Sequence, residues 1–166
     1  MSSEADARVF GILRQRGLLS PSIQKVMLGF MAQWGVDAFR AVVETHIVEE
    51  SKIADILSQE LKFPRLTGVR ILNVPKETLA FIPYNLALEL VTFPFDINHE
   101  GRLYVVFADP SDPERIKRLE NWTKKSIEPF VGERSEIIAA IQRHYPLAMQ
   151  LPSLVSFKTP KMDREP

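Results

Sequence analysis

The sequence predicts an α+β fold in which a four-helix repeat, made of two helix–turn–helix units, precedes a small β-β-α-β-α subdomain. Apolar residues recur at helical spacing up to residue 63, and one pattern occurs twice within that stretch. After residue 64, runs rich in β-branched and aromatic residues alternate with segments that start with helix-capping residues. We therefore expect a helical subdomain over residues 1–63, an α/β subdomain over 64–145, and a flexible tail or linker over 146–166.

Four helices are expected in the first subdomain, after a short disordered stretch over residues 1–5. Glycine, proline and capping residues divide the apolar stripes and set the boundaries. In chain order the expected boundary residues are Ala5 and Gly17, then Ser20 and Gly35, then Phe39 and His46, and finally Glu49 or Ser51 with Pro64.

The four helices are two copies of one unit. Residues 9–19 align with residues 38–48 at a separation of 29 positions, so that Phe10 matches Phe39. One further residue enters afterwards, and Ile23 then matches Ile53. A single helix–turn–helix cannot bury both of its faces, so we expect the two copies to pack together.

The second subdomain starts with a loop or extended segment over residues 66–74, followed by short helical turns that Pro75 and Pro83 open. Pro94 places the first strand at a sheet edge or a bulge. A turn over residues 98–101 joins the first two strands into a hairpin. The later elements are expected as strands Leu90–Phe95, Arg102–Phe107 and Ile127–Val131, a helix capped by Asp112 and running to about Lys124, and a last helix Glu136–His144 capped by Ser135.

Composition excludes several classes of function. Lys+Arg and Asp+Glu both number 21, which argues against a nucleic-acid partner, and the absence of cysteine excludes thiolate chemistry. No apolar run is long enough to span a membrane, and the polar, acidic start has no signal-peptide core, so we expect a cytoplasmic protein without membrane insertion. The sequence has no phosphate-binding or nucleophile motif, and its three histidines lie far apart. We expect no catalytic residues, no metal site and no enzyme.

Two local features could bind a ligand. The segment 109–112, Asp-Pro-Ser-Asp, follows an apolar strand, although the same residues also cap helices for reasons of backbone hydrogen bonding alone. Arg8 stands beside Phe10 at the start of the first repeat, where it could pair with a phosphate or stack on a base, or could be an ordinary surface arginine. Trp34 and Trp122 are interpreted as core or interface residues rather than ligand platforms.

Several segments carry a family resemblance. The most specific is 108–110, Ala-Asp-Pro, which follows a strand within 102–112, Arg-Leu-Tyr-Val-Val-Phe-Ala-Asp-Pro-Ser-Asp. The repeated turns 17–19 and 47–48, the segments 60–64 and 93–95, and the closing helix 137–145 add to it. Their order resembles the N-terminal domain of type II secretion and type IV pilus assembly ATPases, the GspE/PilB/MshE group, over roughly residues 6–145. The resemblance implies a non-catalytic regulatory or interaction domain whose partner is a protein of a secretion, pilus or motility apparatus. No ATPase core is present, so the chain is expected to be a stand-alone relative or a fragment.

Some members of that group bind cyclic di-GMP through two copies of a motif, which makes a cyclic di-GMP sensor the alternative function and this dinucleotide the one possible cofactor. The positions that the resemblance assigns to the ligand here are Arg8, Val9, Phe10, Gly17, Phe39 and Asp109. The motifs are degenerate, because phenylalanine replaces an early glycine in both copies. Such a ring would fill the space where glycine lets backbone approach the ligand, or would offer a stacking surface instead.

Overall fold

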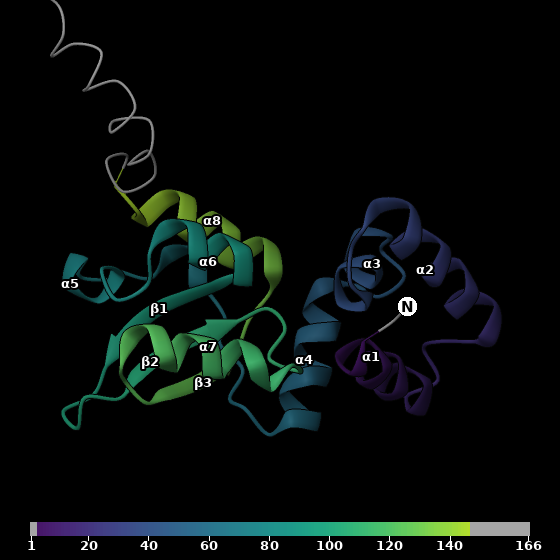
Figure 1. The fold of residues 1–166 in the computed structure, drawn as a ribbon, viewed down its shortest axis with the longest axis horizontal. Helices are drawn as coiled ribbons and strands as arrows, with labels where there is room; N and C mark the ends of the chain where they lie inside the picture. The colour runs from purple at the N-terminus through teal and green to yellow at the C-terminus, as the bar shows by residue number, and fades with distance from the viewer. Residues whose placement is uncertain (1–2, 147–166) are drawn as a thin grey trace, which may run out of the picture.

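The structure is a computed structural model that describes residues 3–146 (Figure 1). The expected tail over 146–166 lies outside the described residues except for Pro146. The elements in chain order are α1 (Glu4–Gln15), α2 (Pro21–Trp34), α3 (Ala38–Glu44), α4 (Glu50–Leu61), the 3-10 turn η1 (Val69–Ile71), α5 (Lys76–Leu79), α6 (Tyr84–Leu90), β1 (Thr92–Ile97), β2 (Leu103–Phe107), α7 (Pro113–Thr123), β3 (Ile127–Val131) and α8 (Arg134–His144). This order confirms the α+β fold class.

Short polar side chains start the first three helices. Ser20 and Asp37 each accept a first-turn backbone N–H, and Ser3 forms a capping box with Asp6. The helix therefore begins at Glu4, within the stretch that was expected to be disordered. Asp6 is only 7% exposed, and its second carboxylate oxygen accepts the Ala38 N–H at 2.9 Å. One buried carboxylate thus serves the first turns of both α1 and α3, which joins the two repeats.

The two copies of the repeat have different neighbours. α3 packs against both α1 and α2, whereas α4 packs against β3 and lies between these helices and the sheet (Figure 1). Arg16, just after α1, pairs with Glu60 of α4 at 2.8 Å. The copies are in contact as expected, but the second helix of the second copy packs on the α/β part of the chain.

The sheet has the order β1-β2-β3. β1 and β2 form an antiparallel hairpin, and β2 runs parallel to β3 with α7 as the crossover. A bulge lies between Pro94 and Asp96 on the edge strand β1, as the proline predicts. The first strand begins at Thr92 rather than Leu90, because α6 continues to Leu90 and Val91 turns the chain in a left-handed conformation.

The outer edge of β3 has no free N–H donor within the strand. The Ile127 N–H donates to the Glu120 carboxylate, and the Val131 N–H donates to the Pro64 carbonyl. Pro129, which lies between them on the same edge, has no N–H. The edge is therefore protected against pairing with another strand.

The start of α8 differs from the expectation. Glu133 occupies the N-cap position, and Ser135 lies inside the first turn. The Ser135 backbone N–H and hydroxyl both donate to Glu50 at the start of α4, at 2.9 and 2.6 Å. The expectation that Ser135 caps the helix was therefore wrong, because a carboxylate from another helix takes over the capping of α8.

The core runs continuously through both parts of the chain, and its largest fully buried side chains include Leu13, Met27, Phe93 and Phe107. Trp34 and Trp122 lie outside it, at 62% and 61% exposed, so the core alternative for them is wrong. Within residues 3–146 no single helix is long and apolar enough to cross a membrane; only α2 and α3 taken together, with a bend of 103° between them, reach that length and composition.

Candidate functional site

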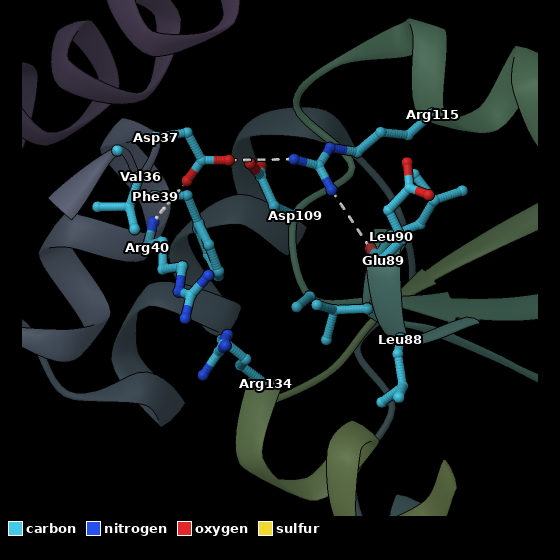
Figure 2. Close-up of a pocket in the computed structure, with 13 residues that line it drawn as sticks. Val36, Asp37, Phe39, Arg40, Leu88, Glu89, Leu90, Asp109, Arg115 and Arg134 are labelled. Carbon is cyan, nitrogen blue, oxygen red and sulfur yellow. Dashed lines mark hydrogen bonds and ion pairs between the residues drawn. The ribbon is translucent and has the colours of Figure 1, made fainter. Parts of the chain in front are cut away.

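A cavity of about 230 Å³ lies where the helical repeat meets the α/β part (Figure 2). Its walls come from the α2–α3 loop and α3, from the end of α6, from the segment after β2, and from the starts of α7 and α8. The end of β2 and the start of α7 are joined by the segment Asp109–Asp112, which the sequence marked as a local candidate. Asp109 of this segment lines the cavity, whereas Ser111 and Asp112 line a second cavity of about 570 Å³ together with Arg8.

Arg115 of α7 crosses from one wall to the other. Its Nη2 lies 3.1 Å from Asp37 Oδ2, and its Nη1 donates to the Leu90 carbonyl at 3.3 Å (Figure 2). Its buried Nε has no partner among the described residues. Asp37, for its part, also caps α3 by accepting the Arg40 N–H. This ion pair joins the second repeat to the α/β part.

Arg8 makes the corresponding contact from the first repeat. Its Nη1 donates to the Ser111 carbonyl at 3.1 Å. Arg8 and Asp37 are 29 positions apart, the same separation that relates the two copies of the repeat. Equivalent positions at the start of both copies therefore contact the same segment, residues 111–115, Arg8 by a hydrogen bond and Asp37 by an ion pair.

Asp109 lies beneath this segment and is 6% exposed. Its Oδ1 accepts the Ser111 N–H at 3.1 Å and the Ser111 hydroxyl at 2.5 Å. Burial raises the pKa of the Asp109 carboxyl above its usual range, although the Ser111 hydrogen bonds and the positive charge of Arg115 act in the opposite direction. Asp109 thus organises the turn into α7 and also borders the cavity.

The other charged groups of the cavity are less constrained. Arg40 pairs with Glu44 at 2.8 Å, and a hydrogen bond from Arg118 lowers the pKa of Glu89. Arg134, at the start of α8, has no hydrogen-bond or ion-pair partner within residues 3–146 and points into the cavity (Figure 2). The cavity is therefore lined by one guanidinium that has no partner in the described part of the chain, a group suited to binding a small anionic ligand.

The six ligand positions that the resemblance assigned are not gathered around one space. Val9, Phe10 and Phe39 are 2%, 3% and 6% exposed and belong to the core, and of these only Phe39 also borders the cavity. Arg8 meets the segment that follows Asp109, as described above. Gly17 lies beyond the far end of α1 in a left-handed turn, with φ +72°. The rings of Phe10 and Phe39 therefore serve as packing groups rather than exposed stacking surfaces.

Several site residues were missed by the sequence reasoning. Asp37 could have been found from the repeat, because it is the counterpart of Arg8. Arg115 and Arg134 carry no such signal, since each is one of several charged residues on a helix. Within the described residues, no group of three or more histidine, aspartate or glutamate side chains is placed to hold a metal ion.

The chain is similar to two curated type IV pilus assembly ATPases named PilB. It is 26% identical over 142 residues to the protein from Thermus thermophilus, which covers 85% of this chain and 16% of that protein. It is 31% identical over 106 residues to the protein from Myxococcus xanthus, which covers 63% of this chain and 18% of that protein. The chain thus spans less than a fifth of the length of either relative.

Solved structures share the fold. The N-terminal domain of XpsE superposes with a TM-score of 0.71 at 22% identity, over 88% of this chain and 99% of that one. A structure of MshE with cdg superposes with a TM-score of 0.64 at 17% identity, over 82% and 98% of the two chains. The sequence model of the MshEN domain matches residues 66–151, just over half of the chain. Together with the order of elements and the PilB relatives, this match shows that the chain belongs to the MshEN domain family, the N-terminal domains of the GspE/PilB/MshE group.

Proposed function

We propose that this chain is a non-catalytic interaction and regulatory domain of a type IV pilus, type II secretion or related motility apparatus, and that it acts in the cytoplasm. The observation that carries the proposal is the extent of the PilB match: it takes in 85% of this chain but 16% of the ATPase. The unmatched part of these relatives is long enough to contain the ATPase domain. The matched part is then a separate, non-catalytic region. The cavity supports this assignment through one contact, because the ion pair between Asp37 and Arg115 holds the two parts of the chain together.

Quantitative co-purification from the native host tests the proposal. The tagged protein is expected to enrich components of a pilus or secretion apparatus over an untagged control. The purified chain is expected to hydrolyse no ATP above a protein-free blank. Enrichment of none of these components, or ATP turnover that follows the chain through purification, would contradict the proposal.

A second candidate, the cyclic di-GMP sensor, is favoured by one contact. Arg8 reaches the segment after Asp109, so two of the assigned positions lie on elements that touch. In addition, a fold relative was solved with cdg. The buried rings of Phe10 and Phe39 weigh against it, since ordinary ligand stacking needs an exposed face.

Titration calorimetry with cyclic di-GMP separates the two candidates. Binding should release heat at tens of micromolar ligand and should weaken at least tenfold in Arg8→Ala, because hydrogen bonds to a charged donor are strong. Arg14→Ala, on the same helix, is the matched control and should bind normally. The absence of heat in the folded wild-type protein removes the sensor function and leaves the interaction function standing.

A further inference from the structure

Two arginines point toward one another in the cavity of Figure 2. Arg134 comes from the start of α8, in the α/β part, and Arg40 comes from α3, in the helical repeat. Arg134 has no partner among the described residues, and Arg40 binds Glu44 through its Nε alone, at 2.8 Å. The donors of Arg134 and the terminal nitrogens of Arg40 are therefore unused on two facing walls of one cavity.

The carboxylates near this pair are engaged by other groups. Glu133, which precedes Arg134 in the sequence, pairs with Arg65 at 3.3 Å. The three carboxyl groups that line the cavity also have other partners, and these pairs are Asp37 with Arg115, Glu89 with Arg118, and Asp109 with Ser111. Like charges that share a cavity repel one another, and an anion bound between them would turn that repulsion into attraction.

The size of the cavity restricts the anion. Its volume of about 230 Å³ is below the range of roughly 300–1,000 Å³ that is typical of pockets for drug-sized ligands. A cyclic dinucleotide is therefore too large for the cavity to enclose, whereas a single phosphate-sized anion is not. Guanidinium groups also suit such an anion chemically, because their planar forks bind phosphate oxygens in pairs.

We propose that Arg40 and Arg134 bind one phosphate-sized oxyanion, which links α3 to the start of α8. Neither function proposed above names this ligand, and neither arginine is among the positions that the resemblance assigns to cyclic di-GMP. The ion pair between Asp37 and Arg115 already joins the helical repeat to the α/β part at the same cavity. The anion supplies a second link between these two parts, so its binding stabilises the folded chain.

Thermal melting of the purified chain in inorganic phosphate tests the proposal. Sodium phosphate replaces sodium chloride at constant ionic strength, and the melting temperature of the wild type should rise and then level off in the millimolar range. Arg134→Ala should melt like the wild type in chloride, because the side chain has no partner there, and should lose the saturable rise. Arg40→Ala should lose it too. Lys117→Ala, which removes an exposed and unpaired charge from α7, is the matched control and should retain it.

Phosphate also stabilises proteins in general, because it is excluded from their surfaces. That effect does not level off and is equal in every variant. A rise of this kind alone, or no rise at all, would overturn the proposal.

Titration calorimetry measures the binding directly. The Kd for inorganic phosphate should increase at least tenfold in Arg134→Ala and in Arg40→Ala and stay unchanged in Lys117→Ala. Arg134→Lys retains the charge without the fork and should give an intermediate Kd.

A second series with cyclic di-GMP distinguishes a free oxyanion from a dinucleotide. Binding of the dinucleotide that Arg134→Ala abolishes, without any binding of phosphate, would assign the cavity to the larger ligand and overturn the proposal. The interaction function does not depend on this result, because it is tested by co-purification.

Discussion

The two copies of the helix–turn–helix unit share one pattern of apolar residues but pack against different elements. In the second copy the helix α4 buries Ile53, Ile56 and Leu57 and joins the continuous core beside β3. In the first copy the helix α2 fully buries Met27 and partly buries Ile23, Phe30 and Met31, but it leaves Val26, Leu28 and Trp34 exposed. Both copies therefore form the same helix–turn–helix. The elements packed against each copy decide whether its apolar residues are buried in the core or stay exposed on the surface.

The largest expected effect is the difference in stability loss between alanine variants of Ile56 and Val26, which occupy matching positions of the two copies. Ile56→Ala should lower the free energy of unfolding by about 2–4 kcal/mol, since it removes a buried side chain and leaves a cavity. Val26→Ala should change it by less than about 0.5 kcal/mol. Urea unfolding of both variants measures the difference. Equal losses would mean that α2 is covered in the isolated protein, and the contrast between the copies would disappear.

A second test compares the starts of the two copies. Asp37→Ala removes the cap of α3 and leaves the half-buried Arg115 without its carboxylate, so we expect a loss of about 1–2 kcal/mol. Arg8→Ala removes a hydrogen bond from an exposed side chain to a carbonyl and should cost less than about 1 kcal/mol. Chemical denaturation gives both values. Asp37→Asn retains the cap and should recover part of the loss; an equal loss in both Asp37 variants would locate the effect in the ion pair.

A third test uses the turns within each copy. Gly17 and His46 are counterparts, and both adopt positive φ, at +72° and +57°. His46→Gly should raise the stability by up to about 1 kcal/mol, because glycine reaches this conformation without steric penalty, and Gly17→Ala should lower it by a similar amount. Differential scanning calorimetry can resolve both shifts. A fall in melting temperature for His46→Gly would show that the imidazole makes a contact worth more than the backbone strain.

The smallest expected effect is a change in how the melting temperature depends on pH when Asp109 is replaced by a side chain that cannot ionise. The folded-state pKa of this carboxyl is raised, so its favourable contribution is complete below the ordinary value of about 3.9 and is lost as pH rises through the folded-state pKa. Asp109→Asn cannot ionise and should lack this loss. The difference in melting temperature, variant minus wild type, should therefore increase as pH rises from 4 upward. A flat difference would mean that Ser111 and Arg115 fully offset the burial.

The sequence predicts what short-range chemistry decides. Ser20 and Asp112 cap helices as predicted, and Pro94 marks an edge strand with a bulge. Local signals fail where distant residues intervene: Ser135 resembles a cap, yet Glu50 from α4 takes that role. The strand after α6 was placed too early because residues 86–91 carry no glycine to mark the end of the helix.

Only part of the candidate site could be predicted from the sequence. Arg8 donates to the Ser111 carbonyl, two residues after Asp109, and whether these positions bind a ligand stays a prediction. Phe10 and Phe39 could equally have lined a pocket or filled a core, because helical periodicity does not distinguish the two, and the structure buries both. Arg134 enters the site through the packing of α8, a long-range arrangement that has no local sequence signature.

The protected outer edge of β3 limits how neighbouring molecules can associate when many copies are held close together. With Ile127 and Val131 already donating and Pro129 without an N–H, neighbouring molecules cannot lengthen the sheet on that side by adding a strand. Pro94 and the bulge interrupt the opposite edge. Many copies held at high local concentration can therefore remain individually folded without fusing into larger sheets. Contacts with other proteins are then made by side chains and loops rather than by strand addition at these edges.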